Sequence, residues 1–285
     1  MTANPRLTRG LFDDAAVFPP GLMPLPEAVS AHARHRTAPY AELVGPLVLA
    51  ASTLDELEPL LLQGELLDLS VTCPQGAAQL PAVFAAADRL PVRLRGVEVA
   101  MPPQASVAEF FAALDTASDA GPGEVPVFVE VPRDSRGAEV VTTLANTGYL
   151  AKFRTGGVTA ELYPGVAELA AAIALVVAAG VAFKATAGLH HAIRNTDPAT
   201  GFDQHGFLNL LAAVGAALDG ADERELAAVL ADRDGAAVAA RASALDADAV
   251  RSRFLSFGTC SVLEPLAELV DLGVVPDPDS EGTPA

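Results

Sequence analysis

The alternation of short apolar segments with longer alanine- and leucine-rich segments is the feature that most restricts the fold of this chain. Each apolar segment has the length of one buried strand, and the segments between them have the pattern of helices. This alternation is typical of repeated βα units, in which helices join parallel strands. The expected strands lie at roughly 10–18, 46–52, 66–73, 93–101, 125–131, 149–155, 181–188 and 253–258. Because eight parallel strands close on themselves, the sequence predicts an α/β protein with a (β/α)8 TIM-type barrel.

Helical segments accompany these strands, and a longer stretch follows the seventh strand. The helices are expected at roughly 24–43, 53–64, 77–89, 105–120, 137–147, 163–179 and 260–272. About 65 residues separate the last two strands, roughly twice the length of one βα unit in such a barrel. Within this stretch, Phe207–Leu218, Glu223–Leu230 and Ala236–Arg253 have helical patterns. We expect one barrel domain over residues 1–275, with a helical insertion at about 195–252 on the catalytic rim that acts as a lid or an oligomer contact. The tail, 276–285, is expected to be disordered.

Composition narrows the class of protein and its partners. A chain of 285 residues that is 51% hydrophobic has the size of one barrel and is too apolar for wholesale disorder. Its net charge of −18 argues against binding to nucleic acid or to an anionic membrane surface. The longest apolar run, Val166–Phe183, contains Glu168 and Gly180 and predicts a helix followed by a strand rather than a membrane span. With no signal-peptide pattern and no disulfide framework, the chain is expected in the cytoplasm.

Lys152 and Lys184 stand out because all other members of the set of 18 basic residues are arginines. Both lysines lie near the ends of consecutive predicted strands. The alternation of side chains along a strand places Lys152 and Arg154 on one face, and Lys184 and Thr186 on the matching face of the next strand. If these faces line the barrel, each ammonium group would lower the pKa of the other. A deprotonated lysine attacks a carbonyl, which an arginine cannot do. The alternative is that both lysines are only buried ion-pair partners.

Glu98 and Glu130 are isolated acids inside the apolar fourth and fifth strands, next to the strand that carries Lys152. Because buried acids are rarely unpaired, we expect them to serve as proton relays and counter-ions for the lysines. The alternative is a purely structural salt bridge. Asp13 and Asp14, at the end of the first strand, are further candidates for the same site, although an acidic loop is more often solvated or a helix cap.

The strand ends carry residues suited to binding an anion. A helix start near Cys260 or Ser261 would present free backbone amides, and the loops after the seventh and eighth strands of barrels commonly bind phosphate. Small, basic and histidine residues at the other strand ends complete this set. The predicted anion-binding residues are Arg154, Gly156, Gly157, Gly188, His190, His191, Arg194, Gly258, Thr259, Cys260 and Ser261. A small anionic molecule is therefore the expected partner, and no cofactor is implied.

A metal site is the alternative for the histidines. His190 and His191 would then act together with His205, Cys73 and an aspartate. No His-x-His or His-x3-His spacing occurs in the chain, so we predict no metal. Cys260 is a candidate nucleophile without an evident partner, and most cysteines are small core residues.

Three motifs resemble those of the deoxyribose-phosphate aldolase family, class I aldolases with a (β/α)8 barrel. That family has Lys-Thr-x-Thr-Gly, then Val-Lys-Ala-x-Gly-Gly-Ile-Arg, then Gly-Thr-Ser-Ser. This chain has KFRTG at 152–156, FKATAGLH at 183–190 and GTCS at 258–261. The resemblance implies that Lys152 forms the Schiff base, that Lys184 tunes it, and that the glycine loops bind phosphate. The chain departs from the family at Glu98, where the family has an aspartate, at Ala187 and Leu189–His191, and in the insertion after the seventh strand.

These observations together predict an aldolase-like carbon–carbon lyase that uses a lysine Schiff base on a small phosphorylated or carboxylated carbonyl compound. One alternative is a barrel enzyme that binds a polyanion without an imine, like a phosphoribosyltransferase or a decarboxylase. The other is a non-catalytic barrel that binds a metabolite. A homo-oligomer is compatible with each of them.

Overall fold

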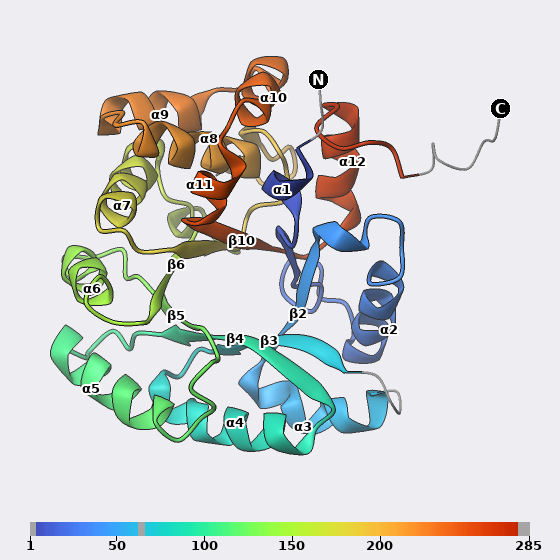
Figure 1. Ribbon diagram of the computed structural model, residues 1–285, viewed down its shortest axis with the longest axis vertical. Helices are drawn as coiled ribbons and strands as arrows, with labels where there is room; N and C mark the ends of the chain where they lie inside the picture. Colours follow the sequence, from blue (N-terminus) through green and yellow to red (C-terminus); the bar gives the residue numbers. More distant parts are fainter. Residues whose placement is uncertain (1–3, 62–65, 279–285) are drawn as a thin grey trace.

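The computed structural model describes residues 4–61 and 66–278 and contains a closed barrel of eight parallel strands (Figure 1). Around the barrel the strand order is β1-β10-β7-β6-β5-β4-β3-β2, so strands adjacent in the barrel follow one another along the chain. The predicted (β/α)8 TIM-type barrel is therefore confirmed. The barrel strands are β1 (Phe12–Asp14), β2 (Val44–Ala50), β3 (Leu67–Cys73), β4 (Val92–Ala100), β5 (Val127–Glu130), β6 (Leu150–Arg154), β7 (Phe183–Thr186) and β10 (Phe254–Thr259).

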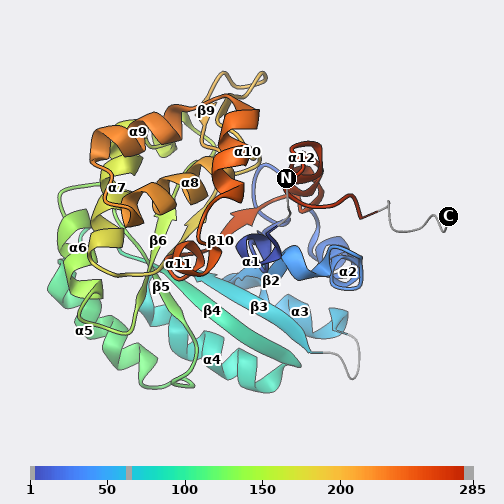
Figure 2. The ribbon, with the colours of Figure 1, turned by 45° about the horizontal axis from the view of Figure 1, so that its top comes forward.

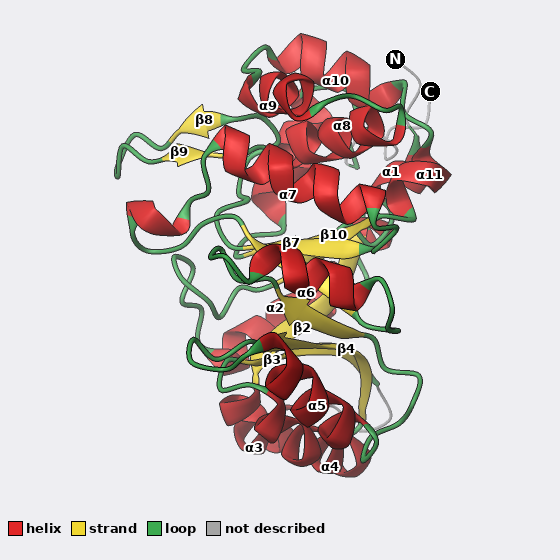
Figure 3. Ribbon diagram, turned by 90° about the vertical axis from the view of Figure 1, so that its left-hand side faces the viewer, coloured by secondary structure: helices red, strands yellow, loops and turns green. Residues whose placement is uncertain are grey.

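Helices cover the outside of the barrel on all sides, with α3, α4 and α5 across the barrel from α7, α8, α9 and α10 (Figures 1 and 3). The helices are α1 (Pro5–Thr8), α2 (Leu25–His35), α3 (Leu54–Leu57), α4 (Leu80–Arg89), α5 (Val107–Ser118), α6 (Gly137–Leu144), α7 (Val166–Ala178), α8 (Phe207–Leu218), α9 (Glu223–Ala231), α10 (Gly235–Ser243), α11 (Ala247–Arg251) and α12 (Leu263–Asp271). Short 3-10 turns are η1 (Ala41–Leu43), η2 (Ala51–Thr53), η3 (Glu58–Leu60), η4 (Ala77–Gln79) and η5 (Ala160–Leu162).

Several predicted helices are shorter than the sequence pattern suggested. The helix predicted over 24–43 ends at His35, and Pro39, which lacks a backbone N–H, lies in the turn that follows. The helix predicted over 53–64 is α3 followed by η3, which contains Pro59; residues 62–65 lie outside the described part. The segment Ala236–Arg253 is divided into α10 and α11, because Asp246 accepts a hydrogen bond from Ala249 and starts a new helix.

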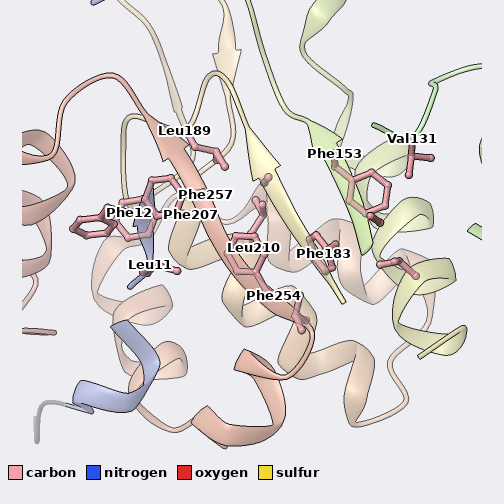
Figure 4. Close-up of a cluster of buried hydrophobic side chains, with 14 of the residues drawn as sticks. Leu11, Phe12, Val131, Phe153, Phe183, Leu189, Phe207, Leu210, Phe254 and Phe257 are labelled. Atoms are coloured by element: carbon pink, nitrogen blue, oxygen red, sulfur yellow. The ribbon is translucent and has the colours of Figure 1, made fainter. Parts of the chain in front are cut away.

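A cluster of aromatic rings packs α8 against the barrel (Figure 4). The rings of Phe207 on α8 and Phe257 on β10 are stacked with their centroids 4.7 Å apart. Phe12 on β1 contacts both of them edge-on, at 6.0 Å and 5.3 Å. Stacked and edge-on pairs of this kind stabilise a core beyond the area they bury. Phe207 therefore holds the segment between β7 and β10 in contact with strands β1 and β10 of the barrel.

The segment between β7 and β10 starts with a short antiparallel hairpin, β8 (Asn195–Thr196) and β9 (Asp203–Gln204). It continues with α8, which packs on α7 and β10, and with α9, which packs on both α7 and α8. Figures 2 and 3 show α8, α9 and α10 gathered with this hairpin at one end of the molecule. The proposed roles of the 195–252 segment as a lid or an oligomer contact remain predictions.

The apolar run of the sequence forms a helix and a strand, as predicted. By length and composition, Ala160–Ala178 is the one stretch of the described residues long and apolar enough to cross a membrane. It includes α7, whose buried residues Leu169, Ile173 and Val176 are three or four positions apart and so share one face. The chain then turns at Gly180 and enters β7. Of the predicted tail, residues 276–278 follow α12 without regular structure, and 279–285 lie outside the described part.

Candidate active site

The two lysines lie side by side inside the barrel. Lys152 on β6 pairs in register with Lys184 on β7. Both are buried, with 5% and 1% of their surfaces exposed. Isolated ammonium groups are costly to bury, so their partners determine what each lysine can do.

Glu98 on β4 is the carboxylate that the lysines share. Its Oε2 lies 3.1 Å from Lys152 Nζ, and its Oε1 lies 2.6 Å from Lys184 Nζ. Ser70 on β3 also donates a hydrogen bond to Oε1, at 3.2 Å. Burial would raise the pKa of Glu98, but the charges of Lys184 and Lys152 outweigh it and lower that pKa to about 2. Glu98 is therefore a carboxylate anion at neutral pH.

Lys184 is enclosed by a second carboxylate. Its Nζ donates to Asp13 Oδ2 at 2.5 Å, and Asp13 also accepts a hydrogen bond of 2.7 Å from Ser256 on β10. Burial would lower the pKa of Lys184, but Asp13 and Glu98 raise it above its usual value. This corrects the expectation that the second ammonium would lower the pKa of Lys184, because two carboxylates outweigh one neighbouring cation. Lys184 is thus a fixed positive charge.

Lys152 borders a cavity of about 410 Å³ at the carboxyl ends of the strands. Glu98, Glu130 and Arg154 also line this space. Among the described residues, Lys184 and Asp13 do not line it. Lys152 is consequently the lysine that a molecule in the cavity would meet, and the carboxyl end of the strands is where barrel enzymes carry their active sites.

Glu130 at the end of β5 joins Lys152 to Arg154. Its Oε2 lies 3.0 Å from Lys152 Nζ, and its Oε1 lies 3.1 Å from Arg154 Nε. Burial would raise the pKa of Glu130, but Lys152 and Arg154 lower it. The side chain of Glu130 is 22% exposed and that of Arg154 is 37% exposed. Both groups therefore line the cavity while they pair with each other.

The ends of β6 and β7 approach so closely that two glycines are required. A Cβ on Gly188 would lie 2.8 Å from the Tyr163 ring and 2.9 Å from the Cα of Gly156. Gly188 also has a left-handed φ of 70°, and the preceding Ala187 has a φ of 66°. Gly156 and Gly188 therefore serve as packing positions, whereas Gly157, Ala187 and Gly258 line the cavity.

Other residues of the predicted anion-binding set lie at or outside the cavity edge. His190 and Cys260 line the cavity and contact each other, with Nδ1 and Sγ 3.3 Å apart. Burial lowers the pKa of His190 and raises that of Cys260. His191 instead pairs with Glu268 on α12, which raises the pKa of His191. Arg194 contacts His205 and Asp203 in the β8–β9 region and does not line the cavity.

The loop after β10 differs from the predicted helix start. The helix α12 begins at Leu263 rather than at Cys260 or Ser261. The Ser261 hydroxyl accepts a hydrogen bond from the backbone of Glu264, and the Thr259 hydroxyl donates to the Ser261 carbonyl. These hydroxyls are therefore engaged within the loop itself.

Asp14 lies apart from the lysines. Its Oδ2 is 3.0 Å from His32 Nδ1 on α2, and both side chains are buried. It does not line the cavity. The two neighbouring aspartates at the end of β1 thus have different surroundings, and of these two only Asp13 contacts Lys184.

The sequence did not identify the hydroxyl groups of Ser70 and Ser256, and it placed Thr186 on the same face as Lys184 without giving that hydroxyl a role. The first two bind Glu98 and Asp13, and the third lines the cavity with a buried Oγ1 that has no partner within the described residues. Each shares its strand with another polar residue, Asp68 in β3, Thr259 in β10 and Lys184 in β7, so none of them stands out in the sequence. It also missed Glu264, whose side chain lies with those of His190 and Cys260 in the one group of metal-ligand type found among the described residues. The alternative set with His205 and Cys73 is not brought together.

Comparisons with known proteins give a distant structural likeness. No family model matches the chain, and no curated protein sequence matches it. Among solved structures, the tetrameric deoxyribose phosphate aldolase from Aeropyrum pernix is similar to this chain, with 16% identity over 94% of this chain and 93% of the aldolase chain, and a TM-score of 0.36. A likeness at this level supports no conclusion about this chain.

Proposed function

We propose that the protein is an aldolase-like carbon–carbon lyase in which Lys152 forms a Schiff base with a small carbonyl compound. The observation that supports this most directly is the position of Lys152 Nζ, at the cavity and between two carboxylates. A buried lysine needed only for an ion pair does not have to face a cavity. The motif resemblance at 152–156 assigns the imine to the same residue.

The chemistry starts with transfer of a proton from Lys152 to a neighbouring carboxylate, for which Glu130 at 3.0 Å is the more accessible. The free amine adds to the substrate carbonyl, and the carbinolamine loses water to give a protonated imine. This imine accepts the electron pair of the breaking carbon–carbon bond and becomes an enamine. The substrate hydroxyl on the carbon that leaves gives its proton to a carboxylate, and its oxygen becomes the carbonyl of the released aldehyde. Protonation of the enamine carbon and addition of water then release the second product and restore the amine.

Lys184 has a different role in this proposal. Its ammonium is held by Asp13 and Glu98 beneath the cavity and stays charged. It fixes the position of Glu98, whose second oxygen faces Lys152. We assign Lys184 as a positioning residue rather than as a nucleophile.

The substrate is proposed to carry a phosphate or a carboxylate. Arg154 is the arginine that lines the cavity. Its Nε donates a hydrogen bond to Glu130. The other N–H groups of the guanidinium are available to bind an anion. The Thr186 hydroxyl, which has no partner in the described part of the chain, lines the same space. A cavity of about 410 Å³ accommodates a small metabolite.

Reductive trapping tests the proposal. The purified protein is incubated with small aldehydes or ketones and sodium borohydride, and the adduct is located by mass spectrometry. Because the chain has only two lysines, the peptide that gains mass identifies the residue. We expect the adduct on Lys152 and its loss in both Lys152→Ala and Lys152→Arg, since arginine keeps its proton.

Arg9→Ala, a surface variant, is the matched control and should trap as much carbonyl as the wild type; its guanidinium forms only an exposed pair with Glu42. An adduct on Lys184, or one that persists in Lys152→Ala, would contradict the proposal. Binding of inorganic phosphate without an adduct would favour the barrel enzyme that uses no imine. Self-association, measured by sedimentation, tests the predicted homo-oligomer separately.

A further inference from the structure

We infer that His190, Cys260 and Glu264 form a binding site for a divalent cation of the zinc type, next to the lysine cavity. The ligand atoms that these residues offer all lie within 4.8 Å of one another. His190 comes from the loop after β7, Cys260 directly follows β10, and Glu264 lies in the first turn of α12. Two segments far apart in the sequence thus bring a nitrogen, a sulfur and a carboxylate close together.

The spacing of these atoms fits a zinc ion. Cys260 Sγ and His190 Nδ1 are 3.3 Å apart. In a tetrahedral site with Zn–S of about 2.3 Å and Zn–N of about 2.0 Å, sulfur and nitrogen are about 3.5 Å apart. A thiolate, an imidazole and a carboxylate are all ligands that zinc accepts, and three protein ligands leave a position open for water or a substrate. Binding would release the thiol proton of Cys260 to solvent as the metal–sulfur bond forms.

Gln204 provides an independent indication that a ligand belongs here. Its side chain is 4% exposed and lines the same pocket, of about 340 Å³, as His190, Cys260 and Glu264. Its Nε2 donates to Asp197, which identifies the other amide atom as the oxygen. That Oε1 is buried with no hydrogen-bond partner in the described part of the chain. An unpaired buried amide oxygen is costly unless a cation or a bound water satisfies it.

The charge of this pocket favours a cation over an anion. Its described lining includes the carboxylates of Asp197 and Glu264 and contains no lysine or arginine. The lysine cavity, in contrast, is lined by Lys152 and Arg154. His190 and Cys260 line both spaces, so a cation bound by them would lie on the border between the two. This differs from the sequence-based expectation that these residues bind an anion.

Metal content measured on the full chain tests the site with zinc alone as the probe. Metal-free protein is equilibrated with zinc in the presence of a weak competing chelator, dialysed and analysed by elemental mass spectrometry. We expect one zinc per chain in the wild type, and an affinity at least about tenfold lower in Cys260→Ser, His190→Ala and Glu264→Gln, by analogy with losses seen when even supporting groups are removed. Cobalt in place of zinc should give a thiolate-to-metal absorption band that Cys260→Ser abolishes.

Cys73→Ala is the matched control, because Cys73 is the other free cysteine and lies buried in β3. It should retain zinc and the cobalt band. Equal zinc retention by the wild type and Cys260→Ser, or no stoichiometric zinc in the wild type, would overturn the inference. Borohydride trapping at Lys152, measured on the same variants, keeps this outcome separate from the proposed lyase function.

Discussion

Lys184 Nζ on β7 donates to Glu98 Oε1 on β4 across 2.6 Å in the closed interior of the barrel, and two strands, β6 and β5, lie between them in the barrel wall. Glu98 has its other oxygen against Lys152. The carboxylate of Glu98 therefore holds the ammonium group of Lys184 in place and keeps it charged, and it also contacts Lys152, which borders the cavity. The stability of this interior and the chemistry proposed for it depend on the same group.

Replacement of Glu98 by glutamine should destabilise the protein by about 3–5 kcal/mol, the range expected when one partner of a buried ion pair is removed. Both lysines would lose a charged partner at a site that is 2% exposed. Urea unfolding measures the loss. Glu130→Gln is the control and should cost less, because the Glu130 side chain is 22% exposed and water compensates part of the change. Equal losses for the two variants would contradict this account of Glu98.

Acid should weaken the folded protein through Glu98. Its pKa is about 2 in the folded chain and 4.5 in its ordinary state. Because the folded pKa is the lower one, the contribution of Glu98 is complete above about pH 4.5 and is lost as the pH falls toward 2. Thermal unfolding followed from pH 6 downward, in roughly half-unit steps, measures it. The melting temperature of Glu98→Gln should fall less steeply over this interval than that of the wild type.

Gly188→Ala should destabilise the chain more than Gly180→Ala. Both glycines have a left-handed φ, 70° and 71°, so either substitution carries the backbone cost of roughly 1–2 kcal/mol. Only the methyl group at position 188 would meet Tyr163 and Gly156, whereas a Cβ at position 180 meets nothing within 4 Å. The difference between the two unfolding free energies should therefore be about 1–3 kcal/mol. The same loss in both variants would show that the strands do not approach as described.

Removal of two hydroxyl groups inside the barrel should affect the stability of the protein to different extents. Ser256→Ala removes a hydrogen bond of 2.7 Å to the carboxylate of Asp13 and should cost roughly 1.5–3 kcal/mol. Thr186→Val removes a buried hydroxyl that has no partner within the described residues, and should leave stability nearly unchanged. If Thr186 contacts the substrate, the valine variant should instead bind inorganic phosphate or the trapped carbonyl more weakly. Chemical unfolding and phosphate titration distinguish these effects.

Much of the fold could be predicted because its strands are buried on both sides and read as apolar runs. All eight barrel strands overlap their predicted ranges. The helix ends were less predictable, since a single proline or an aspartate cap such as Asp246 divides a continuous helical pattern. The pattern of apolar and polar residues along a helix does not show at which residue the folded protein ends that helix.

The candidate site could be located from the sequence because a lysine is rare in this chain and an acid is rare in an apolar strand. Which charged side chains pair with one another inside the site could not be predicted. Asp13 and Lys184 are separated by 171 residues, and only closure of the barrel brings them together. Glu264 gave no signal, since an acid in the first turn of a helix is ordinarily a favourable partner for the helix dipole.

The burial of both lysines leaves the outer surface without any side-chain amine. Every exposed positively charged side chain among the described residues has a guanidinium or an imidazole. Acylating reagents that label amines in most proteins would thus find no lysine on this surface. Slow reaction at Lys184, which does not line the described cavity, would report how often the interior opens to solvent, with no engineered probe.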